Sequence, residues 1–294
     1  MANQIKTGLF LGLLTALLLI MGQAMGGQSG LIIALGLAVV MNVGSYWFSD
    51  KIVLSMYGAK QLTEADAPGL FAVVRRLAQN AGLPMPKLYL VPQEQPNAFA
   101  TGRNPEHAAI AVTEGILRLV STEELAGVLG HEMSHVKHRD ILVQTVASVV
   151  AGAITSIAGM LKWGALFGMG GRDREGGGGM GAAAAILLAV VAPIAALLIQ
   201  MAISRSREFM ADATGAQLAG NPLPLAGALQ KLENYAQAMP MQNANPATEN
   251  MFIISPLGGG GISGLFATHP STEERIRRLT AMARAAAPNQ SVKN

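Results

Sequence analysis

The residues of this chain that could do chemistry gather in the segment His131-Glu132-Met133-Ser134-His135. On a helix, two imidazoles four residues apart lie on one face and can reach a single ion. Glu132 projects beside the first imidazole, where it can take a proton from water at that ion. This H-E-x-x-H pattern is typical of the zinc-binding helix of metallopeptidases. The segment therefore predicts a zinc site with a general base beside it.

A catalytic zinc site has three protein ligands and one open position, so a third ligand must come from elsewhere in the chain. His138 lies seven residues after His131, about 10 Å along a helix axis, so one straight helix cannot easily supply all three ligands. The candidates for the third ligand are three further histidines and one carboxylate: His107, His138, His269 and Glu208.

Glu208 and Asp212 lie four residues apart in a segment that we expect to be helical. Glu208 could bind the ion while Asp212 accepts the other ring N–H of a ligand histidine, as carboxylates behind zinc ligands commonly do. The same two carboxylates could instead be surface groups stabilised by Arg205 and Arg207. Spacing alone leaves both interpretations open.

The composition indicates a membrane protein. Apolar residues make up 51% of the 294 residues and charged residues only 13%, about half the share in soluble domains. The net charge of +3 is too small to indicate nucleic-acid binding. The chain has no cysteine, which excludes disulfides, thiolate metal sites and a cysteine nucleophile.

Long uncharged runs predict about four transmembrane helices, because each approaches the length that crosses a bilayer. Glycines and glutamines between Gln23 and Gly30 divide the first run and predict a hairpin. Buried core helices of a soluble protein, or a cleaved signal peptide after Lys6, are the alternatives. The four runs are Thr7–Gln23, Leu31–Phe48, Ile141–Leu161 and Met180–Ile203.

Lysine and arginine set the expected orientation. Residues 51–140 hold nine of them and residues 204–294 hold eight, whereas the connection between the last two runs and its flanks hold three. The positive-inside rule then places both termini and both polar regions in the cytoplasm. The expected organisation is a transmembrane hairpin at 1–50, a first catalytic half at 51–140, a second hairpin at 141–203 and a second catalytic half at 204–294.

The polar regions contain patterns of folded elements. Thr63-Glu64-Ala65-Asp66 could cap a helix that runs to about Ala81, and capping boxes at Ser121 and Ser271 predict two further helices. The connection Asn243–Gly264 is expected to be long and mobile. Two short runs of strand-forming residues, Lys87–Val91 and Ala108–Thr113, predict strands.

Taken together, these motifs resemble the HtpX family of bacterial membrane zinc metalloproteases, which is related to the CAAX prenyl proteases. The resemblance implies zinc ligands at His131, His135 and Glu208, with Glu132 as general base. It also implies a mainly α, integral membrane protein with a cytosolic α+β catalytic domain of the zincin (gluzincin) type. The matching segments are the apolar hairpin, Asn97–Gly102, His131–Asp140, Ser204–Asp212 and Thr268-His269-Pro270 with Arg275-Ile276.

The activity implied by the resemblance is ATP-independent cleavage of misfolded membrane proteins in the bacterial inner membrane. A processing peptidase with one defined substrate, or a scaffold with a structural zinc, are the alternatives, and Glu132 argues against the scaffold. We expect no nucleotide partner, because the glycine-rich segments 176–181 and 259–264 do not follow a strand of a βαβ unit and no Walker A sequence is present.

Two further roles are expected for the reaction. A donor must stabilise the oxyanion of the transition state, and His269 is the first candidate, with Arg275 as the second. Asn97, Ala98, Phe99 and Ala100 have no charge and good extended propensity, so they could form an edge strand that pairs with the substrate backbone. Because His135 lies six residues before Ile141 and Glu208 five after Ile203, the site should lie within about 10 Å of the membrane interface.

Overall fold

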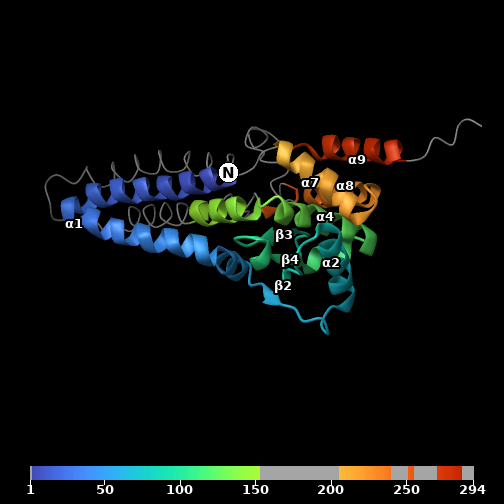
Figure 1. Ribbon diagram of the computed structural model, residues 1–294, viewed down its shortest axis with the longest axis horizontal. Helices are drawn as coiled ribbons and strands as arrows, with labels where there is room; N and C mark the ends of the chain where they lie inside the picture. The colour runs from blue at the N-terminus through green and yellow to red at the C-terminus, as the bar shows by residue number, and fades with distance from the viewer. Residues whose placement is uncertain (1, 153–204, 240–250, 255–269, 287–294) are drawn as a thin grey trace, which may run out of the picture.

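Helices dominate the computed structural model of this chain, and one small sheet lies among them (Figure 1). The expectation of a mainly helical protein is therefore confirmed. The structure describes residues 2–152, 205–239, 251–254 and 270–286. The predicted fourth apolar segment, Met180–Ile203, and the candidate oxyanion donor His269 lie outside the described residues.

The predicted N-terminal hairpin is present as α1, Ala2–Met56, which is interrupted at Gly26 and Gly27. Gly27 has φ +53°, a backbone conformation that favours glycine, so the chain can reverse there. The two arms, Gln4–Gln23 and Gly26–Met56, are both long and apolar enough to cross a membrane. The second arm extends eight residues beyond the predicted end at Phe48, because its last two turns pack on the sheet.

A third apolar helix, Ile141–Gly152, follows the H-E-x-x-H segment and lies against the hairpin. Val143 and Val146 are buried in one cluster with Phe10 and Leu14 from the first arm of α1. This helix is the beginning of the predicted run Ile141–Leu161, whose remaining residues lie outside the described part of the chain.

The sheet has four strands in the order β1-β2-β4-β3. β2 and β4 are parallel, and β1 and β3 pair antiparallel with them at the two edges. Both predicted strands are confirmed, and the segment that begins at Asn97 forms the edge strand β3. The strands are β1 Lys60–Gln61, β2 Lys87–Val91, β3 Ala98–Thr101 and β4 Ala109–Thr113.

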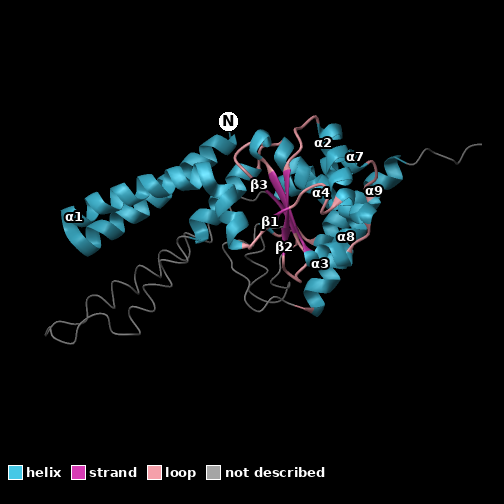
Figure 2. Ribbon diagram, turned by 90° about the horizontal axis from the view of Figure 1, so that it is seen from below, coloured by secondary structure: helices cyan, strands magenta, loops and turns pink. Residues whose placement is uncertain are grey.

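Each face of the sheet is covered by a different part of the chain (Figure 2). Ile110 and Val112 of β4 face the helices of the polar regions, whereas Ala111 faces the end of α1 with Phe99 and Val53. All five residues of β4 are buried, as expected for a strand covered on both sides. The membrane hairpin thus completes the core of the sheet.

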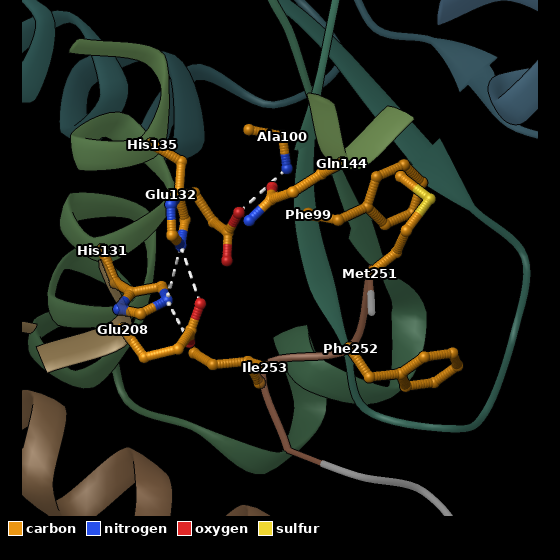
Figure 3. A pocket seen from close by; sticks show the side chains of 10 residues that line it. All are labelled: Phe99, Ala100, His131, Glu132, His135, Gln144, Glu208, Met251, Phe252 and Ile253. Atoms are coloured by element: carbon orange, nitrogen blue, oxygen red, sulfur yellow. Dashed lines mark hydrogen bonds and ion pairs between the residues drawn. The ribbon is translucent and has the colours of Figure 1, made fainter. Parts of the chain in front are cut away.

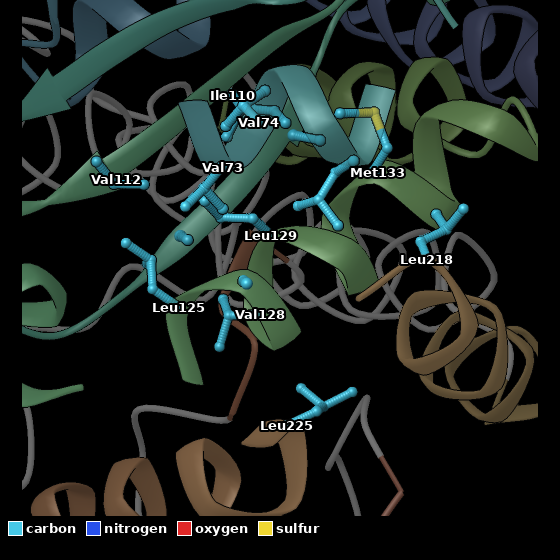
Figure 4. Packing of buried hydrophobic residues seen from close by; sticks show 14 of the residues in the cluster. Val73, Val74, Ile110, Val112, Leu125, Val128, Leu129, Met133, Leu218 and Leu225 are labelled. Carbon is cyan, nitrogen blue, oxygen red and sulfur yellow. The ribbon is translucent and has the colours of Figure 1, made fainter. Parts of the chain in front are cut away.

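The helical layer on the first face is centred on α4, which packs on α2, α7, α8 and β3. Its apolar residues join the largest buried cluster of the described chain (Figure 4). The helices are α2 Pro68–Ala81, η1 Pro105–His107, α3 Glu114–Leu119, α4 Thr122–Lys137, α7 Arg205–Ala219, α8 Leu223–Ala238 and α9 Thr272–Ala286.

Two of the three predicted helix starts are confirmed. Ser121 forms a complete capping box at the start of α4, and Ser271 Oγ accepts a hydrogen bond from the Glu274 backbone N–H at the start of α9. The prediction that Thr63 caps this helix was wrong, because Thr63 and Asp66 close a separate turn and α2 begins at Pro68. Proline disfavours helical backbone in the residue before it and is well suited to the first helical turn, so the helix starts there.

α4 and α7 cross with their backbones in close contact. A Cβ atom on Gly130 would lie 2.7 Å from the Gly215 carbonyl oxygen, and one on Gly215 would lie 2.5 Å from the His131 backbone nitrogen. Side chains never approach backbone atoms this closely, so any larger residue forces the helices apart. The crossing point is directly beside the first candidate ligand.

We predict that Gly215→Ala lowers the free energy of unfolding by about 1–3 kcal/mol, the usual effect of overpacking. The matched control is Gly69→Ala in α2, where an added Cβ meets nothing within 4 Å. Thermal unfolding of both detergent-solubilised, metal-free variants, followed by circular dichroism, measures the difference. Equal melting temperatures for the two variants would contradict the close crossing.

Candidate active site

His131, His135 and Glu208 converge on one point in the structure (Figure 3). The two histidines extend from α4 and the glutamate from α7, and all three side chains are buried. The Nε2 atoms of the histidines are 3.2 Å apart; His131 Nε2 lies 3.6 Å from Oε2 of Glu208, and His135 Nε2 lies 3.6 Å from its Oε1. The structure therefore brings the three predicted ligands together.

These separations fit a zinc ion. Ligand atoms about 2.1 Å from one tetrahedral ion stand about 3.4 Å apart, close to the 3.2 Å between the two Nε2 atoms, and one ligand atom from each of the three residues lies within 4.8 Å of the others. Two imidazole nitrogens and one carboxylate oxygen are also a donor set that zinc commonly has in catalytic sites. The site can thus hold zinc with little rearrangement of its side chains.

Asp212 lies behind the first ligand, as the sequence predicted for a supporting carboxylate. Its Oδ1 atom is 2.9 Å from His131 Nδ1, which leaves Nε2 facing the convergence point. Burial alone would raise the pKa of Asp212, but the charge and hydrogen bonds of Arg275 outweigh it, and this pKa lies well below its ordinary value. Asp212 is therefore an anion that can accept a hydrogen bond from the ring.

Arg275 has a different place from the one expected of an oxyanion donor. Its guanidinium donates to both oxygens of Asp212, at 2.8 and 2.7 Å, and to the Ile253 carbonyl oxygen at 2.7 Å. The side chain is only 1% exposed and does not line the pocket. This geometry corrects the expectation: Arg275 contacts the carboxylate behind a predicted ligand, and all three of its guanidinium nitrogens are engaged in these bonds.

The second ligand, His135, also has a carboxylate behind it, which the sequence analysis did not assign. Asp140 Oδ2 lies 3.4 Å from His135 Nδ1, and Arg207 forms an ion pair with the other carboxylate oxygen. The signal was available in the sequence, since Asp140 is the acidic residue at the junction between the ligand helix and the apolar run that begins at Ile141.

Glu132 faces the convergence point from the next position on α4. One of its oxygens accepts a 2.9 Å hydrogen bond from the Ala100 backbone N–H, and the other points into the pocket (Figure 3). Burial raises the pKa of the Glu132 carboxyl above its ordinary value, although the neighbouring His131 and His135 partly oppose this. A carboxylate with a raised pKa is a better proton acceptor, which suits a general base.

Asn97 does not face the pocket as a substrate-binding side chain. Its Nδ2 donates to the Met251 carbonyl oxygen at 3.1 Å, and its Oδ1 accepts from the Ile253 N–H at 3.2 Å. The amide therefore fixes the segment 251–253 beside β3, where Met251, Phe252 and Ile253 are buried. For these residues, the expectation of a mobile Asn243–Gly264 connection was wrong, and the other residues of that connection lie outside the described chain.

A pocket opens around the convergence point. Gln144 reaches it from the apolar helix Ile141–Gly152, so this helix forms part of the pocket wall (Figure 3). The sequence analysis did not identify Gln144, although a polar residue near the start of an apolar run is itself a signal of function. The lining residues are Phe99, Ala100, His131, Glu132, His135, Gln144, Glu208, Met251, Phe252 and Ile253.

The other candidate histidines lie elsewhere. His138 Nδ1 interacts with the Oγ and the carbonyl oxygen of Ser134, at 3.1 and 2.9 Å. His107 is exposed and interacts with Arg103 and Asn104. Neither belongs to the group of residues that could hold a metal, and His269 lies outside the described residues.

The charges around the pocket also favour a divalent cation. Glu132 and Glu208 both face the pocket beside the imidazole rings. Two buried carboxylates that face one small pocket repel each other unless a proton or a cation is bound. A doubly charged ion would balance them.

Comparison with known proteins assigns the family. The profile described as peptidase family M48 matches residues 64–283, which include all the residues of the site. The chain belongs to peptidase family M48. A protease HtpX homolog of Desulfatibacillum aliphaticivorans is 57% identical over 95% of this chain and 90% of its own length. A second, of Syntrophobacter fumaroxidans, is 54% identical over 96% of this chain and 100% of its own.

The family gives the chain its general activity. It is an HtpX-type M48 metalloprotease, and its two candidate membrane helices agree with a membrane-associated enzyme. Among solved structures, Ste24p of S. mikatae is similar, with a TM-score of 0.50 and 18% sequence identity. The likeness covers 91% of this chain and 62% of Ste24p, and at this identity it concerns the fold alone.

We predict that Glu208→Ala sharply lowers zinc content and abolishes peptide cleavage, because only two of the three converging ligands remain. Asp212→Ala should weaken zinc binding by about 10- to 100-fold, the usual effect of removing a group behind a ligand. Zinc per protein after dialysis against graded chelator concentrations orders the variants.

The control for this series is His138→Ala, which should keep its zinc, because that ring points at Ser134. Loss of zinc from His138→Ala together with zinc retained in Glu208→Ala would reverse the assignment of the third ligand.

Proposed function

We propose that this protein is a membrane-bound, zinc-dependent endopeptidase that cleaves misfolded or damaged membrane proteins at the cytosolic face of the bacterial inner membrane. The observation that carries the proposal is the convergence of His131, His135 and Glu208 beside Glu132. The proposed role is protein quality control, with unfolded protein segments and the lipid bilayer as partners.

His131, His135 and Glu208 would hold one zinc ion per chain. When bound, zinc supplies a Lewis acid that activates water and polarises a peptide carbonyl. Glu132 takes the proton of the attacking water on the oxygen that points into the pocket and passes it to the leaving amine. The Ala100 N–H holds the other oxygen of Glu132, which keeps the carboxylate in place for both transfers.

The substrate backbone would lie along the outer edge of β3. This strand pairs with β4 on one side, and within the described residues no strand pairs with its other side. Since Asn97 and Thr113 are hydrogen-bonded partners at the start of the ladder, the backbone groups of Ala98 and Ala100 point to the outer edge. The Ala100 N–H already donates to Glu132 there, so a peptide at this edge would pair with the other outward-pointing groups. An extended peptide could add there as a further strand, with Phe99 in the pocket wall.

The oxyanion of the transition state needs a donor from the pocket wall. His269, which lies outside the described residues, remains our first candidate from the sequence. Arg275 is no longer a candidate, because all three nitrogens of its guanidinium already donate to Asp212 or to the Ile253 carbonyl oxygen.

We further propose a four-span topology with both termini in the cytoplasm. Two transmembrane hairpins, 1–50 and 141–203, would alternate with the two catalytic halves, 51–140 and 204–294. Its support is the lysine and arginine distribution and the length of Gln4–Gln23 and Gly26–Met56. Gln144 supports a pocket next to the membrane, because it connects the third apolar helix to the site.

The decisive test of the activity is Glu132→Gln, which keeps the size of the side chain and one oxygen but removes the proton acceptor. We predict a near-normal zinc content and a loss of cleavage of casein and of an unfolded membrane protein by a factor of 100 or more, within the range of general base catalysis, about 10²–10⁴. The control is Glu64→Gln, an exposed glutamate that pairs with Arg75 away from the pocket. Activity of Glu132→Gln within tenfold of wild type would exclude this base.

The topology is tested with a reporter that is active only in the cytoplasm. Fusion after Asn294 or insertion near Gly102 should give an active reporter. Insertion near Gly177 should not, because few lysines and arginines lie in or beside the connection between the third and fourth apolar segments. An active reporter at Gly177 would contradict four spans while leaving the zinc site unaffected.

A further inference from the structure

The turn that ends α4 places Asp140 beside the second zinc ligand. Arg139 has φ +57°, the Arg139 N–H donates to the Val136 carbonyl at 3.1 Å, and the Asp140 N–H donates to the His135 carbonyl at 2.9 Å. These two bonds form a Schellman motif, which usually has glycine at the position of Arg139. A non-glycine residue in this conformation is strained and persists when the surrounding structure holds it.

The turn directs the Asp140 side chain back toward the ring of His135. Oδ2 of Asp140 lies 3.4 Å from His135 Nδ1, and the two side chains are 3% and 4% exposed. His135 Nε2 faces the other two ligands, so Nδ1 is the ring atom available to a supporting carboxylate. Both the backbone and the side chain of Asp140 thus contact His135.

Arg207 holds Asp140 from the other ligand-bearing helix. It lies in the first turn of α7, directly before the ligand Glu208, and its guanidinium pairs with Oδ1 of Asp140. One carboxylate therefore connects His135 on α4 with Arg207 on α7. Asp140 also directly precedes the apolar helix Ile141–Gly152, which packs against the membrane hairpin.

The arrangement repeats the one behind His131. There, Asp212 contacts Nδ1 of the ring and Arg275 pairs with Asp212. We infer that Asp140 and Arg207 form a second positioning pair, which orients His135 and makes zinc binding depend on how the membrane-proximal ends of α4 and α7 meet. This inference rests on the proposed zinc site.

The test uses Asp140→Asn, Arg207→Gln and the double variant of the full-length protein in detergent. Zinc affinity is measured by chelator competition, ligand geometry by the visible spectrum of the cobalt-substituted protein, and folding by the melting temperature of the metal-free protein. Each single variant should weaken zinc binding about tenfold or more and alter the cobalt spectrum. The double variant should bind zinc as Asp140→Asn does, because Arg207 acts through Asp140.

The matched controls are Asp66→Asn and Arg118→Gln, an exposed carboxylate and an exposed guanidinium engaged elsewhere, which should leave zinc affinity and the cobalt spectrum unchanged. Arg207→Lys keeps the charge and should retain most of the affinity. Since Lys also retains the ion pair, it provides a folded variant if Arg207→Gln is unstable.

The outcomes separate this inference from the proposed function. If Glu208→Ala loses zinc while the Asp140 and Arg207 variants keep wild-type affinity and spectrum, the positioning pair is wrong and the zinc site stands. The inference would also be wrong if the variants lowered the melting temperature without changing the zinc affinity. It would equally be wrong if the losses of zinc affinity in the two single variants added up in the double variant. A wild-type protein that binds no zinc would overturn the proposed function and this inference with it.

Discussion

The backbones of α4 and α7 touch where Gly130 meets Gly215, and this contact sets the distance between the ligands of the two helices. His131 directly follows the contact on α4, and Glu208 lies two turns before it on α7. With larger residues at the crossing, the helices would separate by more than the few tenths of an ångström that metal coordination tolerates. The proposed zinc site therefore depends on glycine at both positions of the crossing.

Close contact also buries charge, and the surrounding structure has to compensate for it. Four carboxylates around the site are at most 6% exposed: Glu132, Asp140, Glu208 and Asp212. Two of them pair with arginines, and Arg275 also joins α9 and the 251–253 segment to Asp212. Because an uncompensated buried charge is strongly destabilising, these pairs make the fold and the metal site interdependent.

The catalytic part and the membrane part of the molecule share their cores. The end of α1 covers one face of the sheet through Val53 and Leu54, and the helix that follows the ligand helix contributes Gln144 to the pocket. A hydrogen bond between Thr101 of the edge strand and Thr145 of that helix joins the two parts again, at 3.1 Å. A change in the packing of the apolar helices is therefore expected to reach the pocket directly.

The sequence by itself determined the features that depend on local spacing. The four-residue spacing on a helix places His131 with His135 and Glu208 with Asp212, and the capping box starts α4 at the expected residue. Short runs of strand-forming residues mark β2 and β4. The apolar hairpin also follows from composition alone. Such signals are contained within a few turns of chain, so the sequence states them directly.

Only the tertiary structure decided which partners the polar side chains choose. Arg275 could reach either the pocket or a buried carboxylate, and packing of α9 directs it to Asp212, 63 residues away. Asn97 likewise binds the 251–253 segment and does not line the pocket. Choices between distant partners depend on desolvation and on the geometry of several packed elements at once, which no local pattern encodes.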